Sequence, residues 1–67
     1  MRANLSGATL IECELNKANL IGADLRNALF VKCDLRGAQL ARAQIEGARL
    51  VACNTIGADL PDGLVRR

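Results

Sequence analysis

The feature that most constrains the fold of this chain is a repeat of five residues, which runs from Ala3 almost to the C-terminus. Counting in fives from Leu5, twelve of thirteen positions carry a large apolar residue, and the exception is Thr55. The position two residues before each of these is always Ala, Cys or Gly. The other three positions of each unit are mostly polar, charged or Gly. Each unit therefore has two residues suited to a protein interior and three suited to its surface.

Neither an α-helix nor a straight strand can bury this repeat on one face. On an α-helix a step of five residues turns the side chain by about 140° beyond a full turn, so the Leu residues would spiral around the helix. On a strand an odd step sends successive Leu residues to opposite faces. A chain that turns a corner after every unit directs the same two side chains inward each time. Four such sides would close one coil, with a period of four units, and successive coils would stack as a solenoid.

The units resemble the pentapeptide-repeat family, whose consensus is close to A(D/N)LXX. Units that match this consensus include Ala18-Asn19-Leu20, Ala23-Asp24-Leu25 and Ala58-Asp59-Leu60, and Cys33-Asp34-Leu35 matches it with Cys in place of Ala. The resemblance covers essentially the whole chain. It implies an all-β fold, namely a right-handed quadrilateral β-helix (a solenoid) of about three coils with four units in each. The large and small apolar residues would lie inside.

The repeats are expected to occupy residues 1–60, followed by a terminating turn and a basic tail at 61–67. Pro61 lacks a backbone donor, and Asp62-Gly63 is typical of turns. The segment Leu60-Pro61-Asp62-Gly63 is also similar to the turn that ends the repeats in many cyanobacterial members of the family.

Charged residues spaced by 20 support a coil of four units. Residues on adjacent coils would lie roughly 4.8 Å apart, where opposite charges are favoured. Four of the five charged pairs at this spacing have opposite signs: Glu12–Lys32, Arg26–Glu46, Arg42–Asp62 and Glu46–Arg66, with Glu14–Asp34 the like-charged exception.

The three cysteines, Cys13, Cys33 and Cys53, are also spaced by 20 and are predicted to form one column. A column of thiols suggests a metal site, a disulfide or adventitious oxidation. However, the chain has no His and no CxxC pair, and its Cys count is odd. Each Cys occupies the small inward position, where a free Cys packs as a small apolar side chain. We therefore interpret the cysteines as core residues, and we expect no metal and no cofactor.

Catalytic chemistry has no candidate residues in this sequence. The glycines at positions 7, 22, 37, 47 and 57 end their units, where a corner can require positive φ, and they do not form a phosphate-binding loop. There is no His base, and the few Ser and Thr residues have no evident partner for nucleophilic catalysis. The prediction is that the protein is not an enzyme and binds no small-molecule substrate.

The net charge of +2 comes from interleaved acidic and basic residues, without a basic run of the kind that binds nucleic acid. No apolar stretch is long enough for a membrane span, and the N-terminus lacks a signal-peptide pattern. Three cysteines without a secretory signal suit a reducing compartment. We expect a cytoplasmic protein that binds no nucleic acid and does not insert into a membrane.

One side of the predicted coil is apolar outside as well as inside. Ile11, Val31 and Val51 occupy the same outward position in successive coils, and Leu29 is close to Val31 in the sequence. Exposed apolar patches often mark binding surfaces. The alternative is structural, because β-branched residues simply suit extended backbone.

The N-terminal coil is a second candidate surface. Met1-Arg2 leads directly into the first repeat, so Leu5 and Leu10 would have no capping element over them. They are expected to contact a second copy, a neighbouring subunit or the rest of a longer chain.

Two functions follow from these patterns. The first is a structural or protein-interaction module, such as a small subunit of a larger assembly, that binds a protein or a second copy of itself. The second is implied by the family resemblance, which includes members that mimic DNA and bind gyrase, conferring quinolone protection. The short chain and its charge of +2 disfavour this second function.

Overall fold

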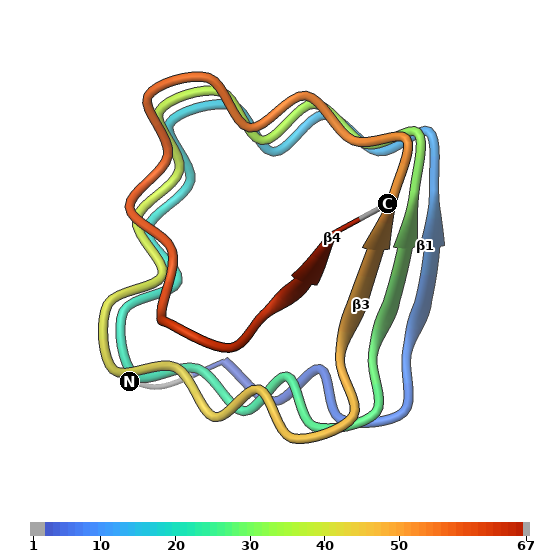
Figure 1. The fold of residues 1–67 in the computed structure, drawn as a ribbon, viewed down its shortest axis with the longest axis vertical. Coiled ribbons are helices and arrows are strands. Elements are labelled where there is room, and N and C mark those ends of the chain that lie inside the picture. Colours follow the sequence, from blue (N-terminus) through green and yellow to red (C-terminus); the bar gives the residue numbers. More distant parts are fainter. Residues whose placement is uncertain (1–2, 67) are drawn as a thin grey trace.

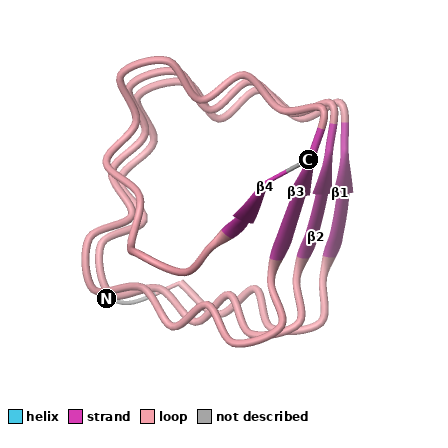
Figure 2. Ribbon diagram, viewed as in Figure 1, coloured by secondary structure: helices cyan, strands magenta, loops and turns pink. Residues whose placement is uncertain are grey.

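The computed structural model describes residues 3–66, with side chains up to Leu64. The chain follows a four-sided path, and successive passes lie on one another (Figure 1). One side consists of the strands β1 (Thr9–Ile11), β2 (Leu29–Val31) and β3 (Arg49–Val51), and a final strand β4 is formed by Val65–Arg66. These strands form one parallel sheet in the order β1-β2-β3-β4. Turns and loops form the other three sides (Figure 2), and residues 3–66 contain no helix.

The predicted spacing of 20 is confirmed up to Asp59. Leu10 lies beside Phe30 in the β1–β2 pair, and Phe30 lies beside Leu50 in the β2–β3 pair. Isolated parallel bridges on the other sides have the same spacing, from Asn4–Asp24 to Gln39–Asp59. We refer to residues 3–22, 23–42 and 43–62 as the first, second and third coils.

The core lies inside the second coil and its contacts with the third. Leu25, Phe30, Leu35, Leu40 and Leu50 have at most 1% of their surface exposed. In the first coil Leu20 belongs to the core, whereas Leu5, Leu10 and Leu15 are only partly buried and pack against it. Ile45 and Leu60 do the same near the other end. Burying one such side chain contributes about 1.5–3 kcal/mol, so most of the hydrophobic stabilisation comes from the middle of the stack.

Every corner from residue 7 to residue 57 has the same backbone feature, a residue with positive φ at the fifth position of the unit. The glycines at 7, 22, 37, 47 and 57 adopt it as expected, but so do six other residues: Glu12, Lys17, Asn27, Lys32, Arg42 and Ala52. At eight corners the next N–H donates to the carbonyl three residues earlier, from Ala8–Leu5 to Ala58–Thr55, at 2.9–3.1 Å. This is the geometry of a type II turn, whose third residue requires positive φ.

The Asn or Asp at the second position of many units stabilises these turns. Its Oδ1 accepts a hydrogen bond from the N–H two residues later, as in Asn19–Ile21 and Asp34–Arg36, both at 3.1 Å. Such local bonds favour a turn over an extended strand. The side that forms β1, β2 and β3 has Thr9, Leu29 and Arg49 at this position instead, and it is the side with regular strands. An Asn or Asp at the second position thus occurs only on turn sides, where Glu14, Gln39 and Gln44 also occupy this position.

The last strand departs from the regular spacing of the coils. β4 pairs Val65 with Arg49 and Arg66 with Leu50, so its partners are nearer in the sequence than those of β2 and β3. The expectation that Arg66 stacks on Glu46 is therefore wrong, and the inward direction that the repeat predicts for the Val65 side chain lies outside what the structure describes. Pro61 has no N–H to continue the ladder, and the next positive φ occurs at Gly63, one residue later than the repeat requires. The chain then crosses the end of the coils to reach β3 (Figure 1), and Leu64 packs against the core.

The ion pairs also differ from those expected from the spacing of 20. Among the residues whose side chains the structure describes, ion pairs form within a coil, between Asp24 and Arg26 and between Asp34 and Arg36, each at 2.7 Å. The predicted pairs Glu12–Lys32, Arg26–Glu46 and Arg42–Asp62 are not among them. An Asp that already accepts the N–H two residues later also lies next to that residue's side chain, which favours the pair within the coil. All four paired groups are partly exposed, so these bonds contribute little to stability.

Candidate protein-interaction surface

The outward residues of β1, β2 and β3 form a continuous apolar column. Ile11 lies beside Val31, and Val31 lies beside Val51. The central residue of each strand faces inward, and Phe30 is 1% exposed, so its strand neighbours face outward. Ile11 is 60% exposed, whereas Val31 and Val51 are half-buried. We call Ile11, Val31 and Val51 the apolar column.

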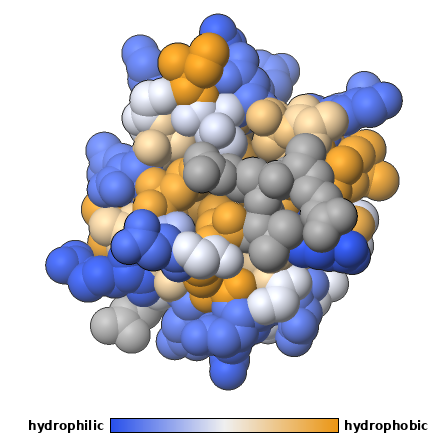
Figure 3. All heavy atoms as spheres, in the orientation of Figure 1, coloured by the Kyte–Doolittle hydropathy of each residue, from blue (hydrophilic) through white to orange (hydrophobic). Residues whose placement is uncertain are grey.

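Leu29 widens this surface at the level of the second coil. In the sheet it lies between Thr9 and Arg49, both of which are exposed. Leu29 is itself half-buried. Figure 3 shows apolar side chains at the right-hand edge of the molecule, where the sheet lies in Figure 1. The structure therefore offers an apolar strip with Thr9 and Arg49 at its margin.

Leu5 and Leu10 do not belong to this strip. Both are partly buried and pack against the core from the first coil. β1 is an edge strand of the sheet within residues 3–66. The two leucines therefore lie at the end of the stack, separate from the apolar column on its side.

Sequence reasoning missed two other exposed apolar features. Ile56 is 75% exposed, and the residues at the same position of the two coils beneath it are Arg36 and Asn16, so it stands alone among polar residues. A second run of half-buried apolar residues occupies the outward position of another side, at Ile21, Ala41 and Pro61. The same spacing of 20 that revealed the apolar column would have revealed this run.

The cysteines lie in one column, as predicted. The residue after each upper Cys donates to the carbonyl of the Cys beneath, from Asp34 N–H to Cys13 C=O at 2.9 Å and from Asn54 N–H to Cys33 C=O at 3.1 Å. Cys33 belongs to the core, and the other two thiols are half-buried against it. Burial raises the pKa of the Cys53 thiol.

The structure also explains why Cys recurs at these corners. The corners after β1, β2 and β3 lack the turn hydrogen bond found at the other corners between residues 3 and 60. Here the thiols act as donors instead: Cys33 Sγ lies 3.3 Å from Leu10 O, and Cys53 Sγ lies 3.4 Å from Phe30 O. Each thiol therefore links a strand-side corner to the coil below.

Comparison with known proteins places the repeats in a family. A family model described as pentapeptide repeats (8 copies) matches residues 1–37 and 18–54. The chain belongs to the pentapeptide-repeat family. No curated protein matches this pentapeptide-repeat chain as a relative. Within its described residues, no helix is both long and apolar enough to cross a membrane.

Proposed function

We propose that this pentapeptide-repeat protein is a non-enzymatic interaction module, a right-handed quadrilateral β-helix of about three coils that binds a partner protein through the apolar column. In this proposal it acts as a small subunit of a larger assembly. The observation that carries the proposal is the exposure of Ile11, 60% of whose surface is accessible, in register with Val31 and Val51.

The energetics favour a contact larger than the column itself. Covering an apolar side chain contributes about 25 cal/mol per Å² of buried surface, so three aliphatic side chains supply only a few kcal/mol. Stable complexes bury roughly 800 Å² on each partner. The column would therefore be the centre of an interface, with Leu29 beside it and the exposed Thr9 and Arg49 at its rim.

The end of the first coil is a second contact surface in this proposal. Leu5 and Leu10 are partly buried there, and β1 has a strand on one side only within residues 3–66. A neighbouring protein that covers this end would complete the burial of both leucines. DNA mimicry gains no support from the net charge of +2, and we expect the chain not to inhibit gyrase.

Photo-crosslinking from two matched positions tests the main surface. A photoreactive residue at position 11 should give a defined crosslinked product in the native cell extract, and Val31→Glu should remove it. The same photoreactive residue at position 56 is the control, because Ile56 is also an exposed Ile but lies on another side. Equal products from both positions, or a product at position 11 that survives Val31→Glu together with unchanged mass in light scattering, would contradict the proposal.

A further inference from the structure

Within residues 3–66, the third coil has a strand over it only at β3, and the shortened path to β4 bypasses the side formed by residues 43–47. In the coils below, this side has a regular ladder. The third-position N–H donates to the next coil, as from Leu25 to Gln44 C=O at 2.8 Å, and the fifth-position N–H does the same, as from Asn27 to Glu46 C=O at 2.9 Å. The first-position carbonyl accepts in turn, as Ala23 does from Gln44.

The same groups one coil higher are the N–H of Ile45, the N–H of Gly47 and the carbonyl of Ala43. None of the three has a hydrogen-bond partner within residues 3–64. The chain turns at Asp62-Gly63 toward β3, so it does not run over residues 43–47. A row of unpaired donors and an acceptor of this kind is able to pair with a strand from another chain.

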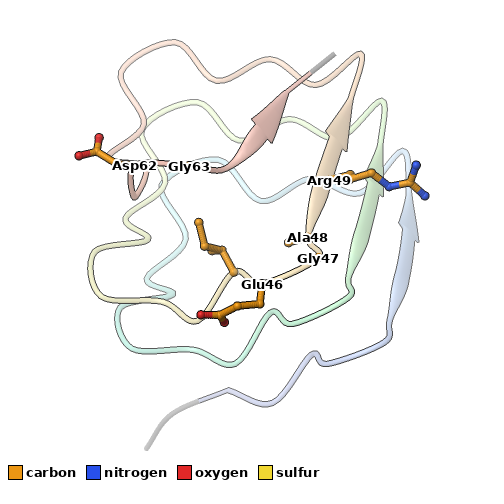
Figure 4. Close-up of a pocket in the computed structure, with 7 residues that line it drawn as sticks. Glu46, Gly47, Ala48, Arg49, Asp62 and Gly63 are labelled. Carbon is orange, nitrogen blue, oxygen red and sulfur yellow. The ribbon is translucent and has the colours of Figure 1, made fainter.

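A notch of about 420 Å³ lies next to this free edge, lined by Ile45, Glu46, Gly47, Ala48, Arg49, Asp62 and Gly63. Ile45 and Ala48 make part of its wall apolar. Glu46 and Asp62 are exposed and form no ion pair within residues 3–64. Figure 4 shows the Arg49 side chain directed away from both carboxylates. The notch therefore combines backbone donors with two carboxylates that form no ion pair among the side chains of residues 3–64.

We propose that the 43–47 edge binds an extended segment of a partner protein, which adds as a parallel strand and places a basic side chain beside Glu46 and Asp62. The backbone carbonyls of the added segment accept from Ile45 and Gly47, and one of its N–H groups donates to Ala43. This is strand addition, in which main-chain bonds give affinity and side chains give selectivity.

The charge of the added residue follows from the coil beneath. Arg26 occupies the fourth position of the second coil and Glu46 the same position of the third. The hydrogen bond with Asp24 is the main cause of the raised pKa of Arg26, and the negative charge of Glu46 adds to it. A basic residue at the fourth position of the added strand would continue this alternation. It would also form a charge-assisted hydrogen bond with a carboxylate at the rim.

Two peptides test the proposal: acetyl-Ala-Asn-Leu-Arg-Gly-amide and the same peptide with Glu in place of Arg. Binding is followed by amide chemical shifts and amide hydrogen exchange of the full chain. We expect the Arg peptide to shift and protect the Ile45 and Gly47 amides, with about threefold to tenfold tighter binding than the Glu peptide. Because the protein carries +2 overall, a general charge effect would favour the Glu peptide instead.

Two variants make the test specific. Glu46→Arg should reverse the preference between the peptides, whereas Val31→Glu, which disrupts the apolar column, should leave both affinities unchanged. Absence of protection at Ile45 and Gly47, equal affinity for the two peptides, or an unchanged preference in Glu46→Arg would overturn the proposal. The peptides test the 43–47 edge, whereas Val31→Glu in the crosslinking experiment tests the apolar column. Either proposal can therefore be contradicted without affecting the other.

Discussion

The side chain of Asn27 occupies the space that a Cβ atom at Gly47 would need. The two residues hold the same corner of adjacent coils, and both have positive φ, at 62° and 77°. Because the coils stack, the side chain at one corner limits which residue fits at the corner above it.

Gly47→Ala should destabilise the protein more than Gly57→Ala. Both substitutions place Ala at positive φ, which costs about 1–2 kcal/mol. Only at position 47 does the new methyl group collide with Asn27, whereas at position 57 the nearest atom is in ordinary contact at 3.9 Å. Urea unfolding of the two variants measures the difference between their free energies of unfolding. Adding Asn27→Ala to Gly47→Ala should recover part of the loss, and simple additivity of the two changes would argue against this coupling.

Ala52→Gly should stabilise the protein. Ala52 has φ 56° at the corner after β3, where its methyl group opposes the left-handed conformation. Relief of this strain exceeds the extra entropy that Gly has in the unfolded chain, for a net gain of about 0.5–1 kcal/mol. Thermal unfolding detects this gain as a higher Tm. Ala41→Gly is the control, because Ala41 is outside the positive-φ positions, and this variant should lose stability.

Acid should weaken the fold through Asp24 and Asp34. Hydrogen bonds from the Arg26 and Arg36 side chains hold the pKa of each carboxyl below its ordinary value of 3.8. A depressed pKa in the folded state means that the stabilisation is present above pH 3.8 and is lost as the pH falls through the folded-state pKa. Urea midpoints measured at decreasing pH should show this decline.

The double variant Asp24→Asn, Asp34→Asn is the control for the acid experiment. It distinguishes the effect of the carboxylate charge from that of the turn hydrogen bond. Asn retains the Oδ1 acceptor for the N–H two residues later, as Asn19 and Asn54 show, but it does not titrate. The decline in the urea midpoint should be smaller in this variant. An identical decline in both proteins would assign the acid effect to other groups.

Cys33→Ala should cost more stability than Cys13→Ala. Cys33 is 2% exposed, and its thiol lies 3.3 Å from Leu10 O, so the substitution removes packing and a donor. Loss of one buried heavy atom costs about 1 kcal/mol. The Cys13 thiol is half-buried and lies 3.7 Å from Ile11 O, so its removal eliminates less packing and a weaker hydrogen bond. Equal urea midpoints for the two variants would refute this ranking.

The inward residues could be predicted from the sequence because every unit repeats the same spacing of small and large apolar residues. Ala23, Leu25 and Leu40, for example, are buried as that spacing requires. The sequence also revealed the column of Ile11, Val31 and Val51, because stacking is a simple consequence of a spacing of 20.

Other features depend on backbone geometry that the spacing does not report. The positive φ of Ala52 is imposed by the corner and not by a preference of Ala. The thiol bonds of Cys33 and Cys53 occur at corners after the strands that lack the turn hydrogen bond, and the spacing of inward residues does not specify which corners these are. The altered pairing of β4 follows from how Pro61 and Gly63 redirect the chain, which a pattern of inward residues cannot show.

The altered pairing of β4 also limits how a protein of this kind can grow by duplication. A copied coil placed after Arg66 would begin out of phase with the coil beneath it, because Arg66 pairs with Leu50 and not with Glu46. A coil inserted between Arg42 and Ala43 would meet matching corners above and below. Lengthening of the molecule, in evolution or by design, is therefore expected from insertion into its middle.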